Sequence, residues 1–213
     1  MVKFLVDNKY IETENGANLL QICLENDIYI PNLCYMDDGN PPYAACRLCY
    51  VQINGKPVPA CTQKVTEGLE VKTDTPEVRR LQKTAFRLLL SVHEIKCKEC
   101  PANKRCELQK IAKFLKIGLK PKGLEICLKD PGLDTGHPYL IVDQNRCVLC
   151  GKCVRVCEQK HGHSYLTFAK RGFDTVISAY IEPDESPLHF SGCTACIDIC
   201  PVRAISIKEE VQV

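Results

Sequence analysis

The hydrophobic and polar positions follow three successive patterns along the chain, and the first pattern covers residues 1–76. Apolar and polar side chains alternate over residues 2–6 and again after a polar turn, which is typical of a β-hairpin. Apolar residues then recur at helical spacing over residues 18–26, and the dipeptide Asn54-Gly55 is typical of a tight hairpin turn. This mixture of strands and a helix predicts a small α+β domain.

The second pattern is helical and predicts a small domain over residues 77–125. Thr75 can cap a helix, and Pro76 suits the first helical position because that position needs no backbone N–H donor. Apolar residues continue at helical spacing as far as Val92. A second helix is predicted over residues 106–116.

The third pattern, over residues 126–213, alternates strands and short helices. Residues 139–143 predict a strand, 151–159 a short helix and 164–182 a hairpin, and a second short helix leads to a strand at 204–208. The predicted order is therefore βαββαβ. Two cysteine-rich runs in this segment, NRCVLCGKCVRVC and HFSGCTACIDICP, form a degenerate internal repeat.

Composition narrows the class of protein, because the chain has 16 cysteines. Such a density indicates either a secreted disulfide framework or metal binding. The opening residues MVKFLVDNKY lack the apolar region of a signal peptide, and no apolar run approaches the roughly 20 residues that span a bilayer. We therefore expect a cytoplasmic protein, whose thiols stay reduced and bind metal. The net charge of +2 gives no global indication of nucleic-acid or membrane binding.

Four cysteines with the spacing C-x11-C-x2-C-x11-C form a first set of candidate metal ligands. Thiolates bind iron in fours, and the loops between distant ligands can enclose a small inorganic cluster. A zinc site is the alternative, because a CxxC pair also suits zinc. Cys23, on the apolar face of the helix predicted over 18–26, is interpreted as a packing residue. The first set comprises Cys34, Cys46, Cys49 and Cys61.

A histidine and three cysteines with the spacing H-x3-C-x2-C-x5-C form a second set. The histidine lies one turn before a CxxC pair, so its imidazole can face the same metal. A neutral imidazole in place of a thiolate makes a cluster less negative, which tends to raise the reduction potential, as in Rieske centres. An ordinary buried histidine is the alternative. The second set comprises His93, Cys97, Cys100 and Cys106.

The two cysteine-rich runs match the pattern of two-cluster bacterial ferredoxins, in which three cysteines of one run join the last cysteine of the other. Cys200 is followed by Pro201, as that pattern requires. Gly151 can leave room for the backbone close to a cluster. The third set comprises Cys147, Cys150, Cys153 and Cys200.

The remaining cysteines of the two runs form a fourth set that lacks one thiolate, because Phe190 stands where the pattern requires cysteine. Three interpretations are open: a [4Fe–4S] cluster with another ligand, a [3Fe–4S] cluster that needs only three thiolates, or no cluster. A cluster is favoured, since three correctly spaced thiols are otherwise unexplained. The alternatives for a replacement ligand are His161, His163, His189 and Cys127. The fourth set comprises Cys157, Cys193 and Cys196.

These four sets, in this order, resemble the accessory iron–sulfur region of [FeFe] hydrogenases. They are also similar to the N-terminal iron–sulfur region of the large peripheral subunit of complex I and to the small diaphorase subunit of NAD-reducing hydrogenases. The resemblance implies a β-grasp [2Fe–2S] ferredoxin domain over 1–76, a helical [4Fe–4S] domain with one His and three Cys ligands over 77–125, and a two-cluster βαββαβ ferredoxin-like domain over 126–213. It thus implies a [2Fe–2S] cluster at the first set, [4Fe–4S] clusters at the second and third, and a [4Fe–4S] or [3Fe–4S] cluster at the fourth.

The sequence has no GxGxxG motif, no P-loop and no recognisable flavin site. A chain that holds several clusters and no such site is expected to carry single electrons between partners. The resemblance implies a partner subunit that holds FMN and oxidises NAD(P)H, with a thioredoxin-like [2Fe–2S] companion. The other end of the relay would meet a hydrogenase, a formate dehydrogenase, a second flavoprotein or a ferredoxin. Related modules also serve in electron-bifurcating complexes. The chain itself is expected to have no catalytic site.

Two other classes of protein compete with this interpretation. A small stand-alone reductase would need a site for a two-electron cofactor, which the sequence lacks. A zinc-stabilised interaction or nucleic-acid module is disfavoured, because aromatic residues are few and do not alternate with basic ones. The lysine-rich stretch at 96–122 is either a solvated helix face or a docking surface for an acidic partner such as ferredoxin.

Overall fold

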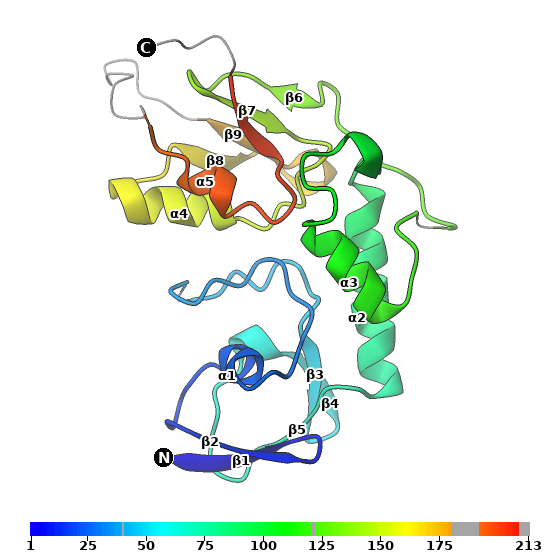
Figure 1. Ribbon diagram of the computed structural model, residues 1–213, viewed down its shortest axis with the longest axis vertical. Coiled ribbons are helices and arrows are strands. Elements are labelled where there is room, and N and C mark those ends of the chain that lie inside the picture. The colour runs from blue at the N-terminus through cyan, green and yellow to red at the C-terminus, as the bar shows by residue number, and fades with distance from the viewer. Residues whose placement is uncertain (40, 121, 180–191, 209–213) are drawn as a thin grey trace. The chain divides into compact units, whose positions relative to one another are not determined.

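The computed structural model of the chain contains both helices and strands (Figure 1). Its contacts divide it into two compact units, and two of the three boundaries between them fall inside helices, namely α2 (Pro76–Ser91) and α3 (Glu107–Leu115). Within the part of the chain that the structure describes, no helix is long and apolar enough to cross a membrane. The described residues are 1–39, 41–120, 122–179 and 192–208.

A five-stranded mixed sheet is the frame of the first unit, which comprises Met1–Leu88 and Ile111–Gly118. The strand order is β2-β1-β5-β3-β4, in which β1 and β5 are parallel and the other neighbours are antiparallel. The strands are β1 (Val2–Val6), β2 (Lys9–Thr13), β3 (Tyr50–Ile53), β4 (Lys56–Pro59) and β5 (Glu70–Lys72).

The local elements predicted for this unit are confirmed. β1 and β2 form the expected hairpin. The turn between β3 and β4 has Asn54 at φ 49° and Gly55 at φ 76°, the two left-handed residues that a type I′ hairpin turn requires. Helix α1 (Leu19–Glu25) begins after Asn18, whose side-chain oxygen accepts a hydrogen bond of 3.2 Å from the Gln21 backbone N–H.

The core of the first unit lies between α1 and the sheet (Figure 1). Phe4 from β1 and Leu20 from α1 are almost fully buried there. Cys23 is part of the same core, which confirms its interpretation as a packing residue. Burial raises the pKa of its thiol to about 12, so it stays protonated at neutral pH.

Helix α2 begins as predicted, with Pro76 as its first residue and Thr75 as its cap. The Thr75 hydroxyl accepts a hydrogen bond of 3.2 Å from the Val78 backbone N–H. Further along the helix, the buried Gln82 amide donates a hydrogen bond of 2.9 Å to the Tyr50 carbonyl, which ties α2 to β3. The predicted second helix is also present, as α3.

The second unit, which comprises Leu89–Lys110 and Leu119–Val213, contains a three-stranded sheet and a hairpin. The three-stranded sheet has the order β10-β7-β6, and β8 pairs with β9. From β7 onward the elements follow the predicted βαββαβ order, to which the short β6 is an addition. The elements are η2 (Cys97–Glu99), β6 (Leu133–Asp134), β7 (Leu140–Asp143), α4 (Lys152–His161), β8 (Leu166–Ala169), η3 (Gly172–Asp174), β9 (Val176–Ala179), α5 (Ala195–Asp198) and β10 (Ile205–Ile207).

The buried Gln144 joins the two sheets of the second unit. Its amide donates a hydrogen bond of 2.5 Å to the Ile177 carbonyl and accepts one of 3.2 Å from the Ile177 N–H. A core of apolar and cysteine side chains lies beside this contact, including Val142, Leu166 and Cys153. The predicted hairpin at 164–182 is present as β8 and β9 up to Ala179, and its last residues lie outside the described part of the chain.

Candidate metal centres

The first set of cysteines lies in the core of the first unit, at the ends of loops that surround β3 and β4. Cys34 follows α1, Cys46 and Cys49 precede β3, and Cys61 lies in the 3₁₀ turn η1 (Ala60–Thr62) after β4. Two backbone contacts hold these loops together: the Ala60 N–H donates to the Cys49 carbonyl at 2.8 Å, and the Asn18 side-chain amide donates to the Cys61 carbonyl at 2.7 Å. All four cysteines are at most 5% exposed.

The four thiols of the first set form two pairs. The Cys34 and Cys46 sulfur atoms lie 3.5 Å apart and share a hydrogen bond, which lowers the pKa of Cys34 and raises that of Cys46. The side chains of Cys49 and Cys61 share another, which together with burial raises the pKa of Cys49. The structure therefore groups thiols that are separated by 11 residues in the sequence into two adjacent pairs.

The second set lies between the end of α2 and the start of α3, and its three cysteines are partly exposed. Cys97 begins the 3₁₀ turn η2, Cys100 follows that turn, and Cys106 precedes α3. Burial raises the pKa of the Cys106 thiol, and the neighbouring Cys100 and Cys97 raise it further. The three thiols thus lie close enough to interact.

His93 is buried, with 8% of its surface exposed, and its ring is fixed by the backbone of the second unit. Its Nδ1 lies 2.8 Å from the carbonyl oxygen of Arg146, the residue before Cys147 of the third set. Since a carbonyl accepts, Nδ1 carries the proton and Nε2 is the nitrogen with a lone pair for a metal. Burial lowers the pKa of the imidazole, which keeps it neutral as ligation requires.

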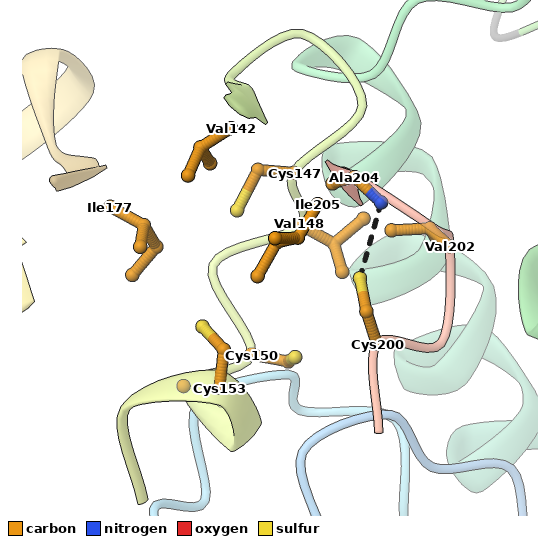
Figure 2. Close-up of a pocket in the computed structure, with 11 residues that line it drawn as sticks. Val142, Cys147, Val148, Cys150, Cys153, Ile177, Cys200, Val202, Ala204 and Ile205 are labelled. Carbon is orange, nitrogen blue, oxygen red and sulfur yellow. Dashed lines mark hydrogen bonds between the residues drawn. The ribbon is translucent and has the colours of Figure 1, made fainter. Parts of the chain in front are cut away.

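The third set lines one pocket of the second unit, although its members come from two distant segments (Figure 2). Cys147 and Cys150 lie in the loop before α4, Cys153 in its first turn, and Cys200 after α5. The space among these residues, counted together with open solvent at its mouth, is about 340 Å³. Its other walls are small or apolar residues: Val142, Val148, Gly151, Ile177, Val202, Ala204 and Ile205.

Backbone N–H groups point at the sulfur atoms of the third set. The Leu149 N–H donates to Cys147 Sγ at 3.4 Å, and the Ala204 N–H donates to Cys200 Sγ at 3.2 Å. Burial raises the pKa of Cys147 to about 12 and that of Cys153 well above its ordinary value, and neighbouring thiols add to both shifts. Free thiolates would therefore be unstable here without a positive group to neutralise them.

The three cysteines of the fourth set also lie together. Burial, and then the nearby Cys157 and Cys193, raise the pKa of Cys196 to about 12. The Tyr165 N–H donates to Cys157 Sγ at 3.4 Å, so this set too has a backbone donor. Phe190, which replaces the expected fourth cysteine, lies outside the described residues.

The alternatives for a fourth ligand lie in different places. The rings of His161 and His163 pack against Tyr165, with centroid distances of 5.4 and 4.3 Å, and are therefore near Cys157. The Cys127 N–H donates to the carbonyl of Ser91 at 2.8 Å, which places the Cys127 backbone beside the end of α2, where Ser91 precedes His93 of the second set by two residues. His189 is outside the described part of the chain.

One feature of these loops gave no signal in the sequence. Residues within three positions of a ligand adopt left-handed backbone conformations although they are not glycine, as Arg47 (φ 52°), Lys104 (φ 66°), Leu149 (φ 52°) and Arg203 (φ 52°) do. Such conformations are uncommon for side chains of this size. They turn the backbone sharply between ligands, which helps the loops present N–H groups to sulfur.

Zinc, the alternative ion for a CxxC pair, has a narrow geometric requirement. A tetrahedral zinc ion at about 2.3 Å from each sulfur needs four ligand atoms within about 4 Å of one another. Within the described ranges, no three His, Cys, Asp or Glu side chains are grouped for one metal ion.

Family models match three successive parts of the chain. Residues 1–76 match a 2Fe-2S iron-sulfur cluster binding domain, and residues 82–119 match the NADH-ubiquinone oxidoreductase-G iron-sulfur binding region. Residues 137–206 match the ferredoxin-like domain of NADH-quinone oxidoreductase subunit 3. The chain is therefore an iron–sulfur protein with 2Fe–2S and 4Fe–4S binding domains, as the sequence predicted.

Individual proteins give the same result. The chain is 31% identical to the 78 kDa subunit of mitochondrial NADH-ubiquinone oxidoreductase of Neurospora crassa over 97% of its length, but it spans only 28% of that protein. It is 27% identical to the gamma chain of the NAD-reducing hydrogenase HoxS of Cupriavidus necator, covering 97% of this chain and 87% of the other. A crystal structure of an NAD+-reducing [NiFe]-hydrogenase contains a similar chain, with a TM-score of 0.82, 28% identity, and coverage of 98% and 88%. The resemblance to complex I and NAD-reducing hydrogenase subunits is confirmed.

Proposed function

We propose that this chain relays single electrons between a subunit that holds FMN and handles NAD(P)H, together with its thioredoxin-like [2Fe–2S] companion, and another redox partner. The observation that carries the proposal is that four sets of thiols with cluster spacing lie in one chain, each gathered in space. The names of the relatives, which include a component of an NAD-reducing hydrogenase, support the link to NAD(P)H. Bound clusters would supply the one-electron chemistry.

We assign the first set to a [2Fe–2S] cluster. Two pairs of thiols fit a cluster of two irons, because each iron can take one pair. The mixed sheet around them, with parallel β1 and β5, supports the assignment of residues 1–76 to a β-grasp ferredoxin domain. The ligands would be Cys34, Cys46, Cys49 and Cys61.

We assign the second set to a [4Fe–4S] cluster held by one histidine and three cysteines, in a small helical domain over 77–125. The hydrogen bond between His93 Nδ1–H and the Arg146 carbonyl supports this role, because metal-binding histidines almost always donate their other ring N–H. That bond fixes the tautomer and the direction of the ring. The ligands would be His93, Cys97, Cys100 and Cys106.

We assign the third set to another [4Fe–4S] cluster, within a two-cluster ferredoxin-like domain over 126–213. The shared pocket and the N–H groups that face Cys147 and Cys200 support this assignment, since such donors stabilise negative sulfur atoms. The ligands would be Cys147, Cys150, Cys153 and Cys200.

We assign the fourth set to a cluster with three cysteine ligands, either [4Fe–4S] with a further ligand or [3Fe–4S]. Because His161 and His163 pack near Cys157, they are better placed as further ligands than Cys127, whose backbone is tied to Ser91. The cysteine ligands would be Cys157, Cys193 and Cys196.

Contacts within the second unit support a continuous relay through three of these sets. The His93 ring is one hydrogen bond from Arg146, which is bonded covalently to Cys147, so the second and third sets are joined. Cys153 and Cys157 lie one turn apart on α4, which joins the third and fourth sets. An electron therefore has a short path along bonded and hydrogen-bonded atoms.

The proposal is tested by loading the chain with ⁵⁷Fe under anaerobic conditions and recording Mössbauer and EPR spectra before and after reduction. About 14 irons are expected with four full clusters, about 13 with a [3Fe–4S] cluster at the fourth set, and about 10 if that set is empty. Mixing the chain with an FMN-containing NADH dehydrogenase should then reduce the clusters in the presence of NADH. Zinc in place of iron would overturn the proposal.

A further inference from the structure

The turn between Cys100 and Cys106 presents basic side chains beside the partly exposed second set. Lys104 and Arg105 are exposed, and so is Lys98 in the 3₁₀ turn η2. We call Lys98, Lys104 and Arg105 the basic turn. Its position means that a protein that binds there would lie next to the thiols of the second set.

The backbone of the basic turn is held in one conformation. The Gln109 side chain accepts a hydrogen bond of 2.9 Å from the Lys104 N–H and donates one of 3.1 Å to the Asn103 side chain. Lys104 itself has a φ of 66°, in the left-handed region that lysine rarely adopts. The fold thus stabilises an unfavourable backbone conformation, which fixes the backbone positions of Lys104 and Arg105.

The positive charges of the basic turn lack the ion pairs that neighbouring lysines make within the described residues. Lys96 pairs with Glu94 at 2.7 Å, and Lys110 pairs with Glu107 at 3.7 Å. Among the described residues, no ion pair involves Lys98, Lys104 or Arg105, and Glu99 is the exposed acid closest to them in sequence. The positive charge is therefore concentrated where the redox site approaches the surface.

We propose that the basic turn is a docking surface for an acidic protein that carries one electron at a time. This inference rests on the proposed function, because it requires a cluster at the second set. One electron would pass between the partner's redox centre and that cluster, so that one is oxidised and the other reduced, and no covalent bond forms or breaks. Opposite charges would speed the encounter and orient the partner.

The test uses the cluster-loaded full chain and a photoreduced plant-type ferredoxin, a small acidic protein that is a strong reductant. The double variant Lys104→Asn with Arg105→Gln removes two charges, and asparagine tolerates the left-handed conformation. We expect the second-order rate of cluster reduction at low ionic strength to fall by about tenfold. The difference should nearly disappear in about 1 M salt, where charges are screened within about 3 Å.

The chain contains a matched control in the turn between β8 and β9. Lys170 and Arg171 form the same dipeptide, both are exposed, and Lys170 is also left-handed, with φ 60°. The double variant Lys170→Asn with Arg171→Gln makes the same change in net charge in the turn between β8 and β9. It should leave the rate with ferredoxin within about twofold of the rate of the unmodified chain. Exposed charges that lie more than a screening length from the docked partner act on it only weakly.

A second reductant separates docking from damage to the cluster. Reduced methyl viologen is a small cation, so its rate should not fall in the Lys104/Arg105 variant. Equal losses in the two double variants, or no loss in either, would overturn the docking proposal. So would an unmodified chain whose clusters are reduced by dithionite but not by ferredoxin. A chain that binds no iron would instead overturn the proposed function, which the iron content and EPR spectrum show before any rate is measured.

Discussion

The first and second sets contrast two ways of holding metal ligands. The four thiols of the first set are buried, Cys49 and Cys61 in a core shared with strands and a helix, and the four already lie in two pairs. The second set is a short segment between two helices, its thiols are partly exposed, and the ring of its histidine is held by a residue 53 positions away. The first set should therefore depend on the stability of its core, and the second on a few hydrogen bonds.

The largest expected effect comes from opening the core around the first set. Phe4→Ala removes a side chain that is 1% exposed and should lower the free energy of unfolding by about 3–5 kcal/mol. Because Cys49 and Cys61 belong to the same core, the [2Fe–2S] EPR signal should weaken while signals of the second unit persist. Denaturant unfolding and EPR would measure both. Tyr10→Ala, on the neighbouring strand and 67% exposed, is the control, with a change of at most about 0.5 kcal/mol.

The next effect should distinguish the units by their response to acid, because the four histidines that the structure describes all belong to the second unit. His137 is buried, and its Nδ1 accepts hydrogen bonds from the N–H groups of Tyr139 and Leu140 at 3.1 and 3.2 Å. Burial, and then the charge of Lys208, lower its pKa to about 4. As pH falls from about 6.5 to about 4, the unfolded chain gains a proton that the folded chain excludes, which costs up to about 3 kcal/mol.

Hydrogen exchange of the Tyr139 and Leu140 amides, corrected for the intrinsic effect of pH, would measure this loss. His137→Asn is the matched variant, since an asparagine oxygen can accept the same N–H groups without titrating in this range. Its protection should fall less between pH 6.5 and pH 4 than that of the unmodified chain. Parallel curves for the two proteins would contradict the role of His137.

A smaller effect should follow from releasing the carbonyl that orients His93. The Asp143 carboxylate accepts hydrogen bonds of 3.0 Å from the N–H groups of Asn145 and Arg146, and it pairs with the Arg146 side chain at 3.1 Å. Asp143→Ala should destabilise the second unit by about 1.5–3 kcal/mol, because these bonds involve a charged group. It should also change the remote-nitrogen coupling of His93 in pulsed EPR, while the [2Fe–2S] spectrum stays the same. An unaltered His93 coupling would show that Asp143 does not position the Arg146 carbonyl.

The smallest effect is expected at an exposed ion pair of the first unit. The Arg79 side chain donates a hydrogen bond of 2.6 Å to Asp74, which lowers the pKa of that carboxyl. Asp74→Asn should cost less than about 1 kcal/mol, since water and salt screen the pair. The ion pair stabilises the folded chain fully at pH values above the pKa of Asp74 in the unfolded chain, which is about 4. This stabilisation is lost as the pH falls through the lower pKa that Asp74 has in the folded chain. Thermal unfolding at neutral pH would measure the change. A larger loss of unfolding free energy in Asp74→Asn would mean that the first unit, too, depends on single contacts.

Much of this architecture could be predicted, because local patterns determine it. The Asn54-Gly55 turn, the capped start of α2 and the βαββαβ order follow from turn residues, capping residues and apolar periodicity. The grouping of the cysteines followed from spacing, and the structure brings the members of each cysteine group together. The membership of His93 in the second set stays a proposal.

Other features depend on contacts between distant residues, which leave no local pattern. The pairing of His93 with the Arg146 carbonyl uses a backbone group that every residue possesses, so no side chain in the sequence indicates it. Arg47, Lys104 and Leu149 are left-handed because surrounding contacts outweigh their own preference for other conformations. The division into two units also depends on long-range packing, since two of its boundaries cut through α2 and α3.

The close pairing of thiols in the first set has a consequence for how the protein is assembled. The Cys34 and Cys46 sulfur atoms are only 3.5 Å apart, and a two-electron oxidation would need a shift of about 1.5 Å to join them as a disulfide. Once joined, neither sulfur could take up iron until a reductant opened the bond. We therefore expect the order of events during maturation to matter at this set: iron and sulfide must arrive before oxidant does.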